Sequence, residues 1–300
     1  MPRFTITPAV AYLMLCLCAL FWGSNITLGR AVHADIPPIA LAFWRNAVAL
    51  TALLIFTHRD VARHWPLMRA HWKLFAASGV IGFALFNAVM YSALHTTTTI
   101  NAALVMSLTP VIVPLFAYFM LQEGMTARQA FGVFASLLGV TVILSRGDLD
   151  ILLGLRFVAG DVIMLIAVAA WSLYTVLVKL RPAPIDPYVF ITISLCFAVP
   201  TLLPFYVWET LAVQAVPWSA PTLATILYIG LVPTTLALVL FNRALDVVGP
   251  SRAGHFQHLV PVAAALLAIL FLGERLREFH VVGTLVIAAG IWFAQRTRNT

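Results

Sequence analysis

Ten apolar stretches, each long enough to cross a bilayer as a helix of about 20 residues, follow one another along this chain. They lie near residues 9–30, 37–57, 72–94, 100–120, 126–145, 159–179, 187–207, 221–245, 251–271 and 278–295. The 300 residues are 62% hydrophobic and only 10% charged, a balance that a soluble domain does not have. The excess apolar surface must face lipid. The sequence therefore predicts an all-α polytopic membrane protein with ten transmembrane helices in one membrane domain, residues 1–300.

The chain also contains an internal repeat. Residues 108–123 read LTPVIVPLFAYFMLQE, and residues 259–274 read LVPVAAALLAILFLGE, at a spacing of 151 residues. The same spacing pairs Pro110 with Pro261, Glu123 with Glu274, Gly132 with Gly283, Gly139 with Gly290 and Leu94 with Leu245. Near the front of each half the spacing is two residues shorter, and it pairs Trp22 with Trp171 and Arg30 with Lys179.

The repeat predicts two five-helix units, residues 1–146 and 147–300. An odd number of crossings places the second unit upside down in the membrane, which gives the inverted repeats that are typical of secondary transporters.

The distribution of basic residues predicts the orientation, because cytoplasmic loops carry an excess of Lys and Arg. With the N-terminus inside, about twelve basic residues lie on the cytoplasmic side and about five outside, and Arg45 lies within a span. The cytoplasmic set includes Arg59, Arg63, Arg69, Lys73, Arg128, Lys179, Arg181, Arg243 and Arg252, and the external set is Arg30, Arg146, Arg156, Arg275 and Arg277. We therefore expect both termini in the cytoplasm, residues 58–71 inside and residues 208–220 outside.

Three features together resemble the EamA-type drug/metabolite transporters. They are CALFWGSNITLGRA in the first span, ALAFWRNAVAL in the second, and the paired Pro-to-Glu helices that are followed by Gly-spaced helices. The likeness covers nearly the whole chain and is closest to the YddG-type bacterial amino-acid exporters. This resemblance implies a central cavity that opens alternately to each side. It also implies export of aromatic and other neutral amino acids across the inner membrane.

Candidate cavity residues lie at matched positions in the two halves. Trp22 and Trp171 fall near the middle of their spans, whereas membrane Trp usually lies in the headgroup belt. Asn25 and Tyr174 follow one turn later, on the same faces. Each first helix of a repeat therefore offers an aromatic and a polar group to an amphipathic substrate. Packing between helices is the alternative.

Further polar groups lie in the third, fourth and ninth spans. Asn87 and Tyr91, four residues apart, share one helix face, and Ser107 precedes Pro110. Such groups either join helices or meet water and substrate. Pro110 and Pro261 are candidate hinges because each removes a backbone donor and displaces the preceding turn.

His258 aligns with Ser107 and is a candidate hydrogen-bonding residue for the substrate. With His255 it forms a pair without a third ligand, so no metal is expected. Proton coupling by His258 and facilitated diffusion both stay open.

The remaining residue patterns narrow the class of protein. No carboxylate lies near a span's midpoint, which argues against a carboxylate proton relay and against a site for cationic drugs. No mid-membrane cluster of Lys and Arg is present to bind the phosphates of a nucleotide sugar or sugar phosphate. No nucleophile–base pair or phosphate loop is evident, so neither a catalytic site nor a cofactor is expected. The net charge of +7 is spread too thinly for nucleic acid.

We therefore expect a monomeric carrier whose partners are the bilayer and small neutral amino acids. Export of other amphipathic metabolites or drugs is the alternative. An intramembrane enzyme or a scaffold is a weaker alternative from another class.

Overall fold

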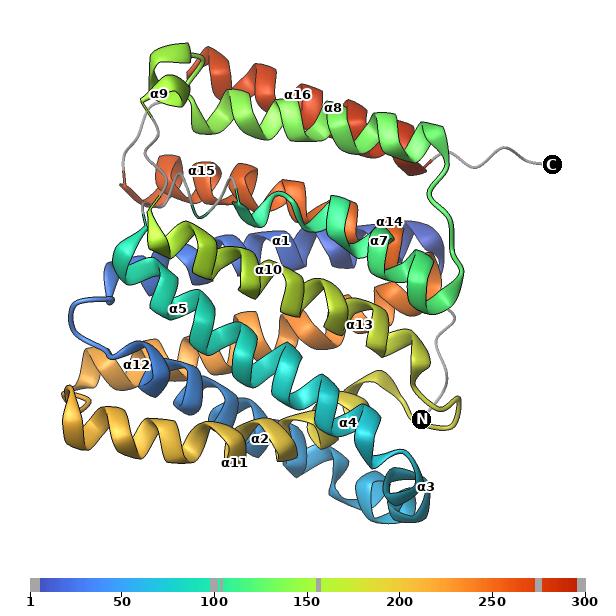
Figure 1. Ribbon diagram of the computed structural model, residues 1–300, viewed down its shortest axis with the longest axis vertical. Coiled ribbons are helices and arrows are strands. Elements are labelled where there is room, and N and C mark those ends of the chain that lie inside the picture. Colours follow the sequence, from blue (N-terminus) through green and yellow to red (C-terminus); the bar gives the residue numbers. More distant parts are fainter. Residues whose placement is uncertain (1–5, 98–101, 103–104, 155–157, 273–276, 296–300) are drawn as a thin grey trace.

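The computed structural model describes residues 6–97, 102, 105–154, 158–272 and 277–295, and every regular element in these residues is a helix (Figure 1). The α-helices are α1 (Pro8–Ala31), α2 (Pro38–Arg63), α3 (Trp65–Ala70), α4 (Trp72–Gly79), α5 (Phe86–Thr96), α7 (Thr109–Leu121), α8 (Ala127–Leu144), α9 (Leu149–Leu153), α10 (Ala159–Leu177), α11 (Pro187–Ala212), α12 (Ala220–Ile229), α13 (Ala237–Val248), α14 (Pro250–His255), α15 (Leu259–Leu272) and α16 (Glu278–Gln295). The π-helical segments are η1 (Val80–Leu85) and η3 (Gly230–Leu236), and the 3₁₀ turns are η2 (Val178–Leu180) and η4 (Phe256–His258).

Seven helical segments in the described residues are long and apolar enough to cross a membrane. They are Pro8–Gly29, Pro38–Arg63, Trp72–Thr96, Ala127–Leu144, Ala159–Leu180, Pro187–Ala212 and Ala220–Val248. Two shorter apolar helices are Thr109–Leu121 and Glu278–Ala294. Each of these segments overlaps one of the spans predicted from the sequence, and together they make a multi-pass membrane protein.

In the described residues, the helices predicted over residues 100–120 and 251–271 are interrupted shortly before Pro110 and Pro261, the prolines predicted to displace the preceding turn. A turn at residues 107–108 precedes α7, so Pro110 lies in the first turn of that helix. The 3₁₀ turn η4 separates α14 from α15, so Pro261 lies in the first turn of α15. Proline has no backbone N–H to donate and its ring crowds the preceding turn, so each helix starts again at its proline. Glu274, the repeat mate of Glu123, lies outside the described residues.

The polar connections predicted at 58–71 and 208–220 are shorter in the structure. α2 continues to Arg63 and α11 to Ala212, while α3 occupies part of the first connection. Helical backbone satisfies its own hydrogen bonds, so it extends beyond the apolar stretch into the polar region. Trp65 begins α3 and Trp72 begins α4, and each has more than half of its surface exposed, as in an interfacial aromatic belt.

The packing of helices from the first half on helices from the second half follows a matched pattern. α1 packs on α13 and α15, and α10 packs on α5 and α7, which are the corresponding helices of the other half. α2 packs on α11 and α8 packs on α16. In Figure 1 the α8–α16 pair forms one end of the long axis and the α2–α11 pair lies towards the other. The crossed contacts of α1 and α10 enclose the centre of the molecule.

Glycines allow a close approach between α8 and α16. A Cβ atom at Gly132 would lie 2.5 Å from the carbonyl oxygen of Gly290, and one at Gly139 would lie 2.7 Å from that of Gly283. The early glycine of one helix thus meets the late glycine of the other, so the two helices run antiparallel. Lipid offers little hydrophobic drive for helix association, and close backbone packing through small residues replaces it.

The two π-helical segments η1 and η3 lie at corresponding places in the two halves. A π turn leaves carbonyl oxygens outside the regular helical ladder and often marks a functional site. Side chains use these oxygens: Trp22 Nε1 donates to Pro233 O at 3.1 Å, and Asn87 Nδ2 donates to Phe83 O at 2.8 Å. Both acceptor residues line the central cavity described next.

Candidate functional site

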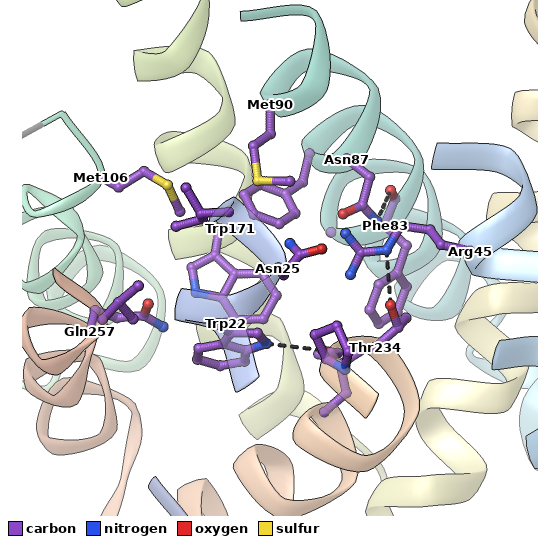
Figure 2. A pocket seen from close by; sticks show the side chains of 16 residues that line it. Trp22, Asn25, Arg45, Phe83, Asn87, Met90, Met106, Trp171, Thr234 and Gln257 are labelled. Carbon is purple, nitrogen blue, oxygen red and sulfur yellow. Dashed lines mark hydrogen bonds between the residues drawn. The ribbon is translucent and has the colours of Figure 1, made fainter. Parts of the chain in front are cut away.

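A central cavity lies where η1, η3, α1, α2, α5 and α10 meet (Figure 2). The centre of a water-sized sphere can occupy about 40 Å³ of it, which is room for a few waters. Both halves of the chain contribute to the lining, which includes Trp22, Asn25, Arg45, Asn87, Trp171 and Gln257. The cavity therefore lies between the two halves.

The aromatic wall of the cavity is formed by Trp22 and Trp171. Their rings meet edge to face, with centroids 5.2 Å apart and an interplanar angle of 83°. Phe241 packs on both rings, and Phe86 packs on Trp171 at 5.1 Å. Because Trp22 and Trp171 are matched positions of the repeat, this contact joins equivalent points of the two halves.

The polar side of the cavity is organised around Arg45. Its Nε donates to Thr234 Oγ1 at 2.9 Å, and its Nη1 donates to the Tyr91 hydroxyl at 2.6 Å. The Tyr91 hydroxyl in turn donates to Asn25 Oδ1 at 2.9 Å. Arg45 and Asn25 are each only 4% exposed. A guanidinium group is thus held at the cavity wall by three helical segments, α2, α5 and η3.

Two amides in the lining keep an unused hydrogen-bonding atom. Asn87 Nδ2 donates to Phe83 O, but Asn87 Oδ1 has no hydrogen-bond partner in the described part of the chain. Gln257 Nε2 likewise has none among these residues. Unpaired buried polar atoms are costly, so both amides are suited to a polar ligand.

Tyr174 and Tyr91, both predicted from the sequence, lie beside the cavity without lining it. Tyr174 is fully buried against Gly82, and its hydroxyl accepts from Asn242 Nδ2 at 2.8 Å. This pair mirrors the pair between Asn25 and Tyr91: Asn25 aligns with Tyr174, and Tyr91 aligns with Asn242. The two halves therefore make the same tyrosine–asparagine hydrogen bond, with the residues exchanged.

Ser107 and His258, also predicted, contact each other rather than the cavity. His258 Nε2 donates to the Ser107 carbonyl oxygen at 2.8 Å, and Nδ1 forms a hydrogen bond with Ser136 Oγ at 2.6 Å. Both ring nitrogens are thus occupied by protein groups. Ser107 and His258 are equivalent positions of the repeat, and they immediately precede the helix restarts near Pro110 and Pro261. The roles of these four residues as substrate contacts and hinges remain predictions.

Sequence reasoning placed Trp22, Asn25, Asn87 and Trp171 among the candidates, and the structure brings these four together in the lining. It missed Arg45, Thr234 and Gln257, together with methionines at 90 and 106. One available signal was an arginine within a predicted span, which marks a functional site by default. The carbonyl-rich π segment that carries Thr234 has no comparable signature in the sequence.

Metal ligation is not supported within the described residues. No three of their His, Cys, Asp and Glu side chains are grouped closely enough to hold a metal ion.

The comparisons with known proteins agree with this architecture. Residues 9–145 and 158–295 each match the EamA-like transporter family. The chain is 24% identical over 280 residues to "Uncharacterized transporter YyaM" of Bacillus subtilis, which covers 93% of this chain and 92% of that protein. It is 27% identical over 283 residues to an "Uncharacterized transporter" of Archaeoglobus fulgidus, which covers 94% and 96% of the two chains.

A solved structure, described only as "Crystal structure of protein", shares the fold. It superposes with a TM-score of 0.76 over 95% of this chain and 96% of that one, at 19% identity. With two family matches that span most of the chain, the protein belongs to the EamA-like transporter family.

Proposed function

We propose that the protein is a secondary transporter that exports neutral amino acids, aromatic ones included, across the bacterial inner membrane by alternating access. It acts as a monomer with both termini in the cytoplasm and two inverted five-helix repeats, residues 1–146 and 147–300. The observation that carries this proposal is the central cavity, which joins an aromatic wall to a polar side at the meeting point of both halves. Such a cavity suits a small amphipathic molecule.

The packing divides the helices around the cavity into two groups. The first group is α1, α13 and α15, and the second is α10, α5 and α7. Both tyrosine–asparagine bonds join one group to the other: Asn25 of α1 bonds Tyr91 of α5, and Asn242 of α13 bonds Tyr174 of α10. When the two groups move apart at one end of the cavity, the bond at that end must break, and it forms again when they return.

The two bonds lie at opposite ends of the cavity. Tyr174 packs on Gly82, and Tyr91 lies on the same continuous helical segment, roughly 13 Å further along at about 1.5 Å per residue. Phe86 and Asn87, which line the cavity, come between them. With the N-terminus inside, the Asn25–Tyr91 bond closes the external end and the Tyr174–Asn242 bond closes the cytoplasmic end. Both bonds are formed in this structure.

Transport by purified protein in liposomes tests the proposal. We expect labelled phenylalanine and threonine to enter faster than glutamate or arginine, because a charged side chain is costly to bury. Broad aromatic faces accept different neutral side chains with energies that differ by only about 1–3 kcal/mol. Runs with and without a pH gradient separate proton-coupled transport from facilitated diffusion. Movement of phosphorylated sugars or lipophilic cations, with neutral amino acids excluded, would contradict it.

A conservative change in the aromatic wall tests whether the cavity is the transport site. We expect Trp171→Phe to slow phenylalanine transport about two- to tenfold, because it removes an aromatic edge contact of about 0.5–1.5 kcal/mol. The matched control is Trp44→Phe, in a tryptophan that packs on Phe43, Tyr206 and Trp218 away from the cavity. Transport rate and melting temperature are measured for both variants. Equal slowing by both would show that Trp171 acts through packing alone.

A further inference from the structure

The charge of Arg45 is the least explained feature of the cavity. Arg45 is 4% exposed and lies within Pro38–Arg63, a helix long and apolar enough to cross a membrane, and no carboxylate among the described residues pairs with it. The ion pair found among the described residues joins Arg181 to Asp246 at 2.7 Å and does not involve Arg45. A buried charge without a counterion is strongly unfavourable, and within a membrane it usually marks a site of function.

The hydrogen bonds of Arg45 orient its guanidinium and leave much of it free. Of the five N–H groups of an arginine, one at Nε and one at Nη1 are used by Thr234 and Tyr91. None of the other described residues accepts a hydrogen bond from the remaining three, which include both N–H groups of Nη2. In Figure 2 the guanidinium nitrogens point towards Asn25, which also lines the cavity. The group is thus fixed in place with donors to spare.

We propose that Arg45 binds the carboxylate of the transported solute, so that amines, amides and esters without this carboxylate are not substrates. A planar guanidinium offers parallel N–H groups that match the two oxygens of a carboxylate. The solute then supplies the counterion that the protein itself lacks. A phosphate dianion calls for a second cation, and Arg45 is the one cation in the described lining.

The rest of the cavity accommodates the remainder of an amino acid. The unpartnered Asn87 Oδ1 can accept from the ammonium group, and the rings of Trp22 and Trp171 face the side chain. The inference rests on one part of the proposed function, namely that the transported solute passes through this cavity. It does not require that the solute be an amino acid.

Four compounds that share a phenyl ring test the carboxylate requirement: phenylalanine, phenylalaninamide, 2-phenylethylamine and 3-phenylpropionate. Each is added to purified wild-type protein, and the melting temperature and the inhibition of labelled phenylalanine uptake are measured. We expect the two carboxylates to raise the melting temperature and the amide and the amine to have no effect. Stabilisation by the amide or the amine equal to that by phenylalanine would overturn the inference.

These readouts separate this inference from the proposed function. If 3-phenylpropionate stabilises the protein while phenylalanine is neither bound nor transported, Arg45 retains its role and the amino-acid proposal fails. If phenylalanine and its amide are transported equally well, the amino-acid proposal stands and the role of Arg45 is wrong.

Substitution at Arg45 then assigns the preference to this residue. We expect Arg45→Gln to lower the preference for phenylalanine over its amide by at least about tenfold. The matched control Arg181→Gln removes the same charge from the ion pair with Asp246, outside the cavity lining, and it should leave the preference intact. If Arg45→Gln does not fold, Arg45→Lys carries the test. It keeps the charge but loses the planar fork, so the half-saturating phenylalanine concentration should rise about tenfold, and an unchanged value would refute the assignment.

Discussion

Gly139→Val is expected to lower the apparent melting temperature of the detergent-solubilised protein by about 5–10 °C. The added side chain begins 2.7 Å from the Gly283 carbonyl oxygen and 2.8 Å from Ile287, so α8 and α16 must separate. Backbone atoms cannot rotate out of the way as a flexible side chain can. The α8–α16 contact is among the most extensive in the molecule, and much packing is lost with it.

Gly124→Val is the matched control, because a Cβ atom at Gly124 would meet nothing within 4 Å. Its melting temperature should stay within about 2 °C of the wild type, as is usual for surface substitutions. Melting is followed by size-exclusion chromatography after heating. Equal losses in the two variants would mean that valine itself, rather than the helix contact, is responsible.

Asn25→Leu and Asn242→Leu are expected to shift the transporter in opposite directions. Leucine has a similar shape but cannot form the bond to Tyr91 or to Tyr174, so each variant weakens the closure at one end of the cavity. A net hydrogen bond is worth about 0.5–1.5 kcal/mol, which is roughly a two- to tenfold shift in population. Between the two variants the ratio of external to cytoplasmic access should therefore change by about 4- to 100-fold.

A cysteine at Leu238, in the cavity lining, reports this access. The native cysteines Cys16, Cys18 and Cys196 are first replaced by alanine. Labelling with an impermeant thiol reagent is compared in right-side-out and inside-out vesicles. Asn25→Leu should speed labelling from outside and Asn242→Leu labelling from inside. A shift of both variants in the same direction is incompatible with closure at opposite ends.

The sequence alone determined the class of the protein and much of its symmetry. Stretches of about 20 apolar residues must lie in lipid, because no soluble core can bury that many of them. Each membrane-spanning helix that the structure describes coincides with one of the stretches predicted from the sequence. The spacing of 151 residues predicted which positions correspond, and the contact between Ser107 and His258 joins one such pair. Mid-span depth and helical periodicity also singled out Trp22 and Trp171, which lie in the cavity wall.

Only the tertiary structure decided which polar groups meet. A helical pattern gives the depth and face of a residue but not the helix that packs against that face, since neighbours are chosen by contacts far apart in the chain. Thus the Tyr174 hydroxyl accepts a hydrogen bond from Asn242, and His258 forms hydrogen bonds with Ser107 and Ser136. Neither Tyr174 nor His258 lines the cavity. Arg45 was visible within its span, but its place in the wall depends on Thr234 of a π-helical segment 189 residues away.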